Sequence, residues 1–263
     1  MKNKSLNPAF ALAVIPVSLI VSIIIFKFLL GNPSNFINGD PENNPLPGNY
    51  LGIIYKGGII VPLLITLLLV VITFCIERYI TVIKSRGKKP VGTFLTEIRT
   101  MITARNIDGA IKACDIQQGS IGNVVKAGLI TFKQMETDKD TDKEHQILTI
   151  QKSIEECSSL ELPMLSKNLP IISTIASIAT LMGLLGTVLG MIKAFAAMAT
   201  AGAPDAVQLA NGISEALINT ALGIGTSAIA IIMYNYFTTR IDSITYGIDE
   251  AGYSIIQAYS STH

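Results

Sequence analysis

The sequence predicts an all-α integral membrane protein with four transmembrane helices. Of its 263 residues 49% are apolar, and its mean hydropathy of +0.49 exceeds that of a soluble domain. The apolar residues are concentrated in four runs, each close to or above the roughly 20 residues that cross a hydrocarbon core. Between the second and third runs lies a long section of mixed charge with helical patterns. We therefore expect long helices that extend from the membrane into a cytoplasmic helical domain.

Residues 1–76 are expected to form an N-terminal membrane hairpin. Its spans cover about residues 10–30 and 51–76, and the loop 31–50 between them is rich in Pro, Asn and Gly. A basic start before an apolar run also opens a signal peptide. Here the run is longer than such a segment and lacks a small-x-small cleavage site, so we expect the first span to be retained. Its removal would leave three spans.

Residues 77–168 are expected to form the helical domain outside the membrane. They contain 14 Lys and Arg against 12 Asp and Glu, mixed in sign as on a solvated helical surface. The charged tract METDKDTDKEH within this section predicts a solvated connector. Four stretches have a helical pattern: residues 91–106, 107–117, 120–135 and 142–165.

Residues 169–237 are expected to form the membrane core. Its two spans cover about residues 170–199 and 212–237, and they are joined by the loop 200–211. The remaining residues, 238–263, predict a C-terminal helix.

The placement of Lys and Arg predicts the orientation. The loops 31–50 and 200–211 contain neither residue. Cytoplasmic loops carry the excess of basic residues. Both short loops are therefore expected to face outward, whereas residues 77–168 and both termini are expected to face the cytoplasm. The section after the second span opens with five basic residues: Arg78, Lys84, Arg86, Lys88 and Lys89.

Composition argues against several classes of protein. A net charge of +1 does not suggest nucleic-acid binding. Cys75, Cys114 and Cys157 are far apart, and His145 and His263 are the only histidines, so we expect no metal site and no disulfide. The Gly-rich run GLLGTVLG lacks the Lys-Ser/Thr ending of a phosphate loop, and no GxSxG or HExxH motif occurs. We expect no enzyme, no catalytic residue and no cofactor.

Small residues follow one face of each of the last two spans. Such faces let membrane helices approach closely, and we expect four glycines to pack these spans together: Gly183, Gly186, Gly190 and Gly223. The third span repeats small side chains at steps of three and four: Ser173, Ala176, Thr180, Gly183, Thr187, Gly190, Ala194 and Ala197. The fourth span has a matching face: Gly212, Glu215, Asn219, Gly223, Thr226 and Ala230.

Glu215 is the one carboxylate in the fourth span. A charge at the bilayer centre costs about 2.5–3.5 kcal/mol on insertion scales, so such residues face a bundle interior or a wet cavity. Because Glu215 lies towards the outer end of the span, snorkelling to the surface is the alternative. Polarity continues inward from it, which snorkelling would not need and which favours a proton-handling site. The residues concerned are Asn219, Thr220, Thr226 and Ser227.

Three motifs resemble the ExbB/TolQ/MotA family of proton-channel and stator proteins, with ExbB the closest branch. They are LMGLLGTVLGMIKAF, GISEALINTALG and YNYF, between residues 181 and 237. The resemblance implies that Glu215 is the family's span carboxylate and that Thr187 and Thr220 are its pore-lining threonines. Secondary candidates for the polar pore face are Asn219, Thr226, Ser227 and Thr180.

The sequence departs from the family pattern in three respects. Ala179-Thr180 stands where the family usually has Ala-Pro, and Ala228-Ile229 stands where it usually has Ile-Pro. Helix kinks at these points are therefore not carried over. The first span is an addition to the three-span plan of ExbB and TolQ.

The resemblance also implies partners and a location. We expect a homopentamer in the bacterial inner membrane, surrounded by membrane lipids, around an ExbD-like single-span protein with a membrane Asp. Proton flow through the complex would drive a TonB-like protein and so energise transport across the outer membrane. Two alternatives stay open: a TolQ-like or MotA-like stator for envelope maintenance or motility, and a non-conducting membrane scaffold.

Overall fold

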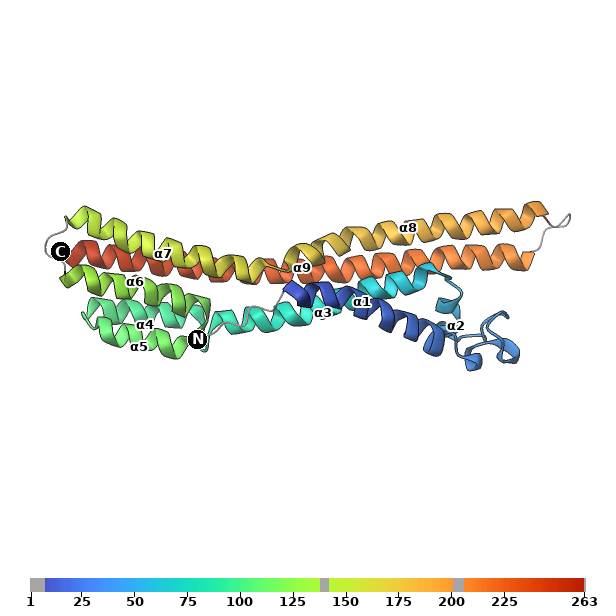
Figure 1. The fold of residues 1–263 in the computed structure, drawn as a ribbon, viewed down its shortest axis with the longest axis horizontal. Coiled ribbons are helices and arrows are strands. Elements are labelled where there is room, and N and C mark those ends of the chain that lie inside the picture. Colours follow the sequence, from blue (N-terminus) through green and yellow to red (C-terminus); the bar gives the residue numbers. More distant parts are fainter. Residues whose placement is uncertain (1–7, 138–141, 201–205, 263) are drawn as a thin grey trace. The chain divides into compact units, whose positions relative to one another are not determined.

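A computed structural model of the chain describes residues 8–137, 142–200 and 206–262, and these residues are almost entirely helical (Figure 1). No strand occurs within those ranges, where the extended backbone makes one isolated bridge, between Phe36 and Pro45. The elements are α1 (Pro8–Ile24), the π-helix η1 (Ile25–Leu30), the 3-10 helices η2 (Pro33–Asn35) and η3 (Ile37–Gly39), α2 (Tyr50–Tyr55), α3 (Ile60–Arg86), α4 (Val91–Thr103), α5 (Ile107–Gln117), α6 (Gly119–Thr137), α7 (Lys143–Ser166), α8 (Leu169–Thr200) and α9 (Ala206–Thr262).

Four helical segments of the described chain are long and apolar enough to cross a membrane, and they contain α1 with η1, α3, α8 and α9. Large apolar side chains on them are exposed in the single chain, such as Leu12 (76%) and Ile232 (66%). Such surfaces are stable only against lipid or other subunits. The prediction of an all-α membrane protein with four spans is therefore confirmed.

Some expected features lie outside the described residues. They are the N-terminal Lys2 and Lys4, residues 138–141 of the charged connector, residues 201–205 of the last loop, and His263.

The chain divides into two compact units. The apolar unit comprises the described residues up to Ile76 together with Ile171–Tyr234, and the polar unit comprises Glu77–Pro170 and the chain from Asn235 onward. The expected domain boundaries, at residues 77, 169 and 238, stay predictions. The expected C-terminal helix is not a separate element, because α9 is one helix that continues from the last span.

The second expected span, about residues 51–76, is two helices and not one. α2 and α3 are separated by a turn in which Gly58 has φ +74°. Only glycine adopts this left-handed conformation at little cost. Pro62 lies in the first turn of α3, where its missing N–H has no intrahelical partner to lose. Mean hydropathy is insensitive to such a turn, since the residues around it remain apolar.

The N-terminal hairpin is held together by buried amide and hydroxyl groups. The Asn35 amide donates to the carbonyl oxygens of Leu29 and Leu30, both at 2.9 Å, which anchors the loop to the end of η1. The hydroxyls of Ser22 in α1 and Thr66 in α3 lie 2.8 Å apart. These contacts fix the added first span against the second.

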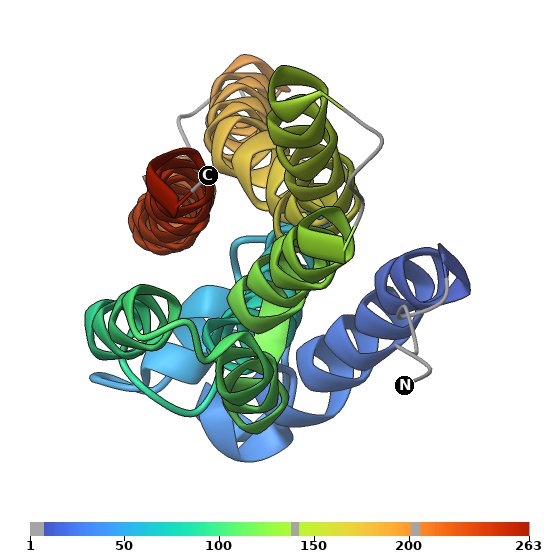
Figure 2. The same ribbon diagram turned by 90° about the vertical axis from the view of Figure 1, so that its left-hand side faces the viewer.

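The polar unit is a helical bundle. α4 packs on α5, α5 on α6 and α6 on α7, as Figure 2 shows in a view along the helices. The last part of α9 completes the core, where Gly128 of α6 lies against Ile154 of α7 and Ile255 of α9. Tyr259 of α9 packs edge-on against Phe132, with ring centroids 4.9 Å apart. The four helical stretches expected between residues 91 and 165 are present as α4 to α7.

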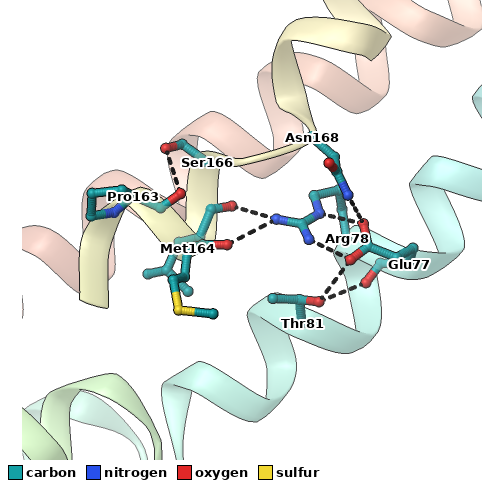
Figure 3. A network of polar contacts seen from close by, with 8 residues as sticks. Glu77, Arg78, Thr81, Pro163, Met164, Ser166 and Asn168 are labelled. Atoms are coloured by element: carbon teal, nitrogen blue, oxygen red, sulfur yellow. Dashed lines mark hydrogen bonds and ion pairs between the residues drawn. The ribbon is translucent and has the colours of Figure 1, made fainter. Parts of the chain in front are cut away.

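A buried ion pair lies within the polar unit (Figure 3). The Arg78 guanidinium donates to both carboxylate oxygens of Glu77, and Asn168 Nδ2 donates to Glu77 Oε2 at 3.0 Å. Arg78 Nη1 also donates to the carbonyl oxygens of Met164 (3.2 Å) and Leu165 (2.9 Å). Carbonyls in the last turn of a helix have no intrahelical donor. Arg78 therefore joins α3 to the end of α7.

Candidate functional site

Glu215 lies on α9 within the apolar unit, and its carboxylate pairs with Lys193 of α8. The distance from Lys193 Nζ to Glu215 Oε1 is 2.6 Å. The Glu215 side chain is 11% exposed, whereas that of Lys193 is 59% exposed. A nearly buried carboxylate thus meets a cation whose stem extends towards it from the surface. Lys193 is thus the residue of α8 that pairs with Glu215.

The turn between α2 and α3 also lies against Glu215. A β-carbon built on Gly58 would come within 2.5 Å of Glu215 Oε1 and 3.6 Å of Lys193 Nζ. Two separate constraints favour glycine at position 58. Its backbone is in the left-handed region, and the Glu215 carboxylate leaves no space for a side chain. The N-terminal hairpin is part of the site, not only a membrane anchor.

Asn219 lies one helical turn from Glu215 and is fully buried. Its Nδ2 donates to the carbonyl oxygen of Gly57 at 2.8 Å, while its Oδ1 has no hydrogen-bond partner among the residues that the structure describes. Its side chain lies directly on Gly186 of α8, where no β-carbon would fit. Leaving a buried acceptor unsatisfied costs about 1–3 kcal/mol. The site therefore contains an acceptor that a donor from a partner or a water molecule could satisfy.

Thr187 of α8 and Thr220 of α9 share a hydroxyl–hydroxyl hydrogen bond. Each hydroxyl also lies within reach of a carbonyl four residues earlier on its own helix, Gly183 O at 3.3 Å and Ala216 O at 3.2 Å. Since each hydroxyl has one proton, one threonine donates to the other, which is left to donate to its own helix carbonyl. Both side chains are half-buried. The two threonines that the resemblance selects are thus in direct contact.

The secondary candidates occupy different environments. Ser227 is buried and donates to the carbonyl oxygen of Ala176 at 2.6 Å, so it joins α9 to α8. Thr226 is also buried, whereas Thr180 is half-buried. Of the four secondary candidates, Asn219 is the one that lies beside Glu215 on the next turn of α9.

The four selected glycines lie where α8 and the first half of α9 run side by side (Figure 1). A β-carbon on Gly223 would come within 2.6 Å of Ala179 O, and one on Gly190 within 2.8 Å of Gly212 O. Gly183 lies against the backbone of Asn219, and Gly186 lies against its side chain. This close packing brings the residues around Glu215 together from two helices.

Two of the three thiols, Cys114 and Cys157, belong to the polar unit and not to the apolar unit that contains this site. Cys114 in α5 is buried, and burial raises the pKa of its thiol to about 12. The pKa of Cys157 in α7 is also raised, by burial and by the nearby charge of Glu161. Within the described residues, no group of three or more His, Cys, Asp or Glu is placed to hold a metal ion.

Lys193 and Gly58 are the site residues that sequence reasoning missed. Both have a signal in the sequence. Lys193 is a cation within the third span, and Gly58 belongs to a Lys-Gly-Gly break within the second. A lone cation and a lone carboxylate in neighbouring spans would have suggested their pairing.

The contact between Lys193 and Glu215 is an ion pair only while the Glu215 carboxylate is charged. When Glu215 takes up a proton it loses its charge, and its attraction to Lys193 falls with it. Asn219 lies on the next turn of α9, and the Thr187–Thr220 pair is a second polar contact between α8 and α9. Such a group is suited to proton transfer within a membrane.

Comparison with protein families gives one assignment. Residues 117–250 match the MotA/TolQ/ExbB proton channel family, a range that includes Lys193, Glu215 and both threonines. No curated protein matches the chain. The match covers more than half of the sequence and ends on α9, beyond the last span. Since the match covers more than half of the chain and contains α8 with Lys193 and the part of α9 with Glu215, the chain belongs to the MotA/TolQ/ExbB proton channel family.

Proposed function

We propose that this chain is the proton-channel and motor subunit of an ExbB–ExbD-like complex in the bacterial inner membrane. The complex uses the proton gradient to energise TonB-dependent transport across the outer membrane. The observation that carries this proposal is the nearly buried Glu215 carboxylate, which pairs with Lys193 on helices that also carry Asn219 and the Thr187–Thr220 contact.

In this proposal Glu215 handles the proton and Lys193 holds the ionised state. Protonation of Glu215 releases Lys193, and the loss of that ion pair lets α8 and α9 shift against each other. One charge crossing 100 mV releases about 2.3 kcal/mol. That amount biases one conformational step, so several protons are needed for each cycle of work.

The proposed complex contains five copies of this chain around an ExbD-like single-span protein with a membrane Asp. The polar unit and both termini lie in the cytoplasm, as the basic residues after the second span favour. The exposed apolar faces of the single chain are the surfaces that neighbouring subunits and lipid would cover.

The test is Glu215→Gln, which keeps the shape of the side chain but cannot exchange a proton. We expect the complex to assemble at normal levels while proton flux in proteoliposomes and energised uptake in cells are lost. Glu250→Gln is the matched control, because Glu250 is an exposed carboxylate on the same helix. If the Glu215→Gln variant kept wild-type flux and uptake, Glu215 would not carry protons. The proposal would then be overturned in favour of a non-conducting scaffold.

The partner identifies the pathway. Purification of the intact complex followed by mass determination should recover the ExbD-like protein, and uptake should depend on a TonB-like protein. Recovery of a partner that binds peptidoglycan would instead assign the chain to a TolQ-like or MotA-like stator.

A further inference from the structure

A second polar site lies within the polar unit, apart from Glu215. It is a pocket of about 250 Å³ between the end of α3, the start of α4 and the part of α9 beyond Asn235. Two arginines and a serine provide its polar side chains: Arg86, Arg240 and Ser243. The other lining residues are Val82, Pro90, Val91, Gly92 and Ile244. We call it the arginine pocket.

The arginine pocket carries positive charge without a matching acid. No carboxylate lines it, and within the described residues neither Arg86 nor Arg240 forms an ion pair. The guanidinium carbon of Arg240 lies 5.3 Å from the centroid of the Tyr236 ring, a cation–π contact. The start of α4 adds the partial positive charge of a helix N-terminus. The unpaired positive charge of the pocket therefore favours the binding of an anion.

Exposed aromatic and aliphatic side chains lead to each arginine along its helix. On α3, Tyr79 (50% exposed) and Ile83 (52% exposed) precede Arg86 at helical spacing, so the three share one face. On α9, the exposed Tyr236 precedes Arg240 in the same way. Tyrosine is enriched where membrane helices leave the hydrocarbon, and arginine there reaches towards headgroups. The same pattern on two helices is typical of a lipid–water boundary.

We infer that the arginine pocket binds the phosphate of an anionic phospholipid, whose acyl chains lie along the faces that contain Tyr79, Ile83 and Tyr236. Guanidinium groups bind phosphate oxygens in pairs of parallel hydrogen bonds, and the Ser243 hydroxyl can donate a further one. An anionic headgroup keeps its net charge, whereas a zwitterionic headgroup brings an ammonium group that two arginines repel. This site is independent of proton handling at Glu215.

The experiment measures lipid binding to the full chain, purified with its complex in mild detergent and stripped of lipid. Phosphatidylglycerol, phosphatidylcholine and inorganic phosphate are added separately, and bound molecules are counted by native mass spectrometry. We expect phosphatidylglycerol to bind at least tenfold more tightly than the other two. Each arginine near a membrane surface contributes roughly fivefold in affinity, so Arg86→Gln with Arg240→Gln should weaken binding by about 25-fold.

Two further variants make the result specific. Arg99→Gln removes the same charge from an exposed position on α4 outside the pocket, and it should bind phosphatidylglycerol like the wild type. Arg86→Lys with Arg240→Lys keeps the charge and should restore part of the affinity. Circular dichroism of each variant confirms that the chain is folded.

Three outcomes would overturn the inference. Equal binding of phosphatidylglycerol and phosphatidylcholine would show that charge is not recognised. Tight binding of inorganic phosphate alone would make the pocket a site for a soluble anion. A changed number of chains per complex in the double glutamine variant would make this face an interface between copies.

Discussion

Lys193 Nζ lies 2.6 Å from Glu215 Oε1 across the contact between α8 and α9, and this ion pair neutralises the one carboxylate of the last span. The pair ties two helices together only while Glu215 is ionised. Its strength therefore depends on the protonation of Glu215, and its removal should be visible in both flux and stability.

Lys193→Met should reduce proton flux in proteoliposomes by about tenfold or more. Without the ammonium group, the charged form of Glu215 loses its partner in a nearly buried position. Lys193→Arg keeps the positive charge and should retain most of the flux. Flux is measured with a pH-sensitive dye under an imposed gradient. Equal flux in the Met variant and the wild type would show that the ion pair is not used.

Gly58→Ala should impair the site more than its backbone conformation alone requires. An alanine at φ +74° costs about 1–2 kcal/mol, and its β-carbon would also displace the Glu215 carboxylate. Gly48→Ala is the matched control, because Gly48 has φ +79° and open space around it.

Both glycine variants should lower the midpoint of thermal unfolding, but only Gly58→Ala should also lower proton flux. If Gly48→Ala reduced flux equally, backbone strain and not the contact with Glu215 would be the cause.

Thr187→Val and Thr220→Val should each lower proton flux while the complex still assembles. Valine has nearly the same shape as threonine but cannot take part in the hydroxyl–hydroxyl bond between α8 and α9. The double variant should lose little more than either single one, because one removal already breaks the bond. Thr73→Val serves as control, since the half-buried Thr73 donates only to Leu69 O on its own helix, at 2.8 Å. Full flux in both single variants would remove this bond from the proton pathway.

Arg78→Gln should destabilise the protein by about 3–5 kcal/mol, because it leaves Glu77 buried without its partner charge. It also removes a donor from the last carbonyls of α7. Glu77→Gln combined with Arg78→Gln should recover part of this loss, since no charge remains buried. Chemical unfolding of the purified complex measures the effect. A double variant less stable than Arg78→Gln alone would contradict the assigned cause.

Hydropathy and periodicity were sufficient to predict the all-α membrane fold and its four spans. Each span needs about 20 apolar residues, a requirement that can be counted along the chain. Asn106 and Gly119 were also predicted to be helix boundaries. In the structure Asn106 caps α5 through its side chain, and Gly119 has φ +73° at the start of α6.

The composition of the Glu215 site could be predicted only in part. The cost of a charge in a membrane selected Glu215, and the family motifs selected Thr187 and Thr220. The pairing of Glu215 with Lys193, its contact with Gly58 and the unsatisfied Oδ1 of Asn219 could not be predicted. These contacts depend on the rotation and axial register of three helices. Sequence periodicity shows which residues share one face of a helix. Which residues of two neighbouring helices come into contact is decided by how those helices pack together.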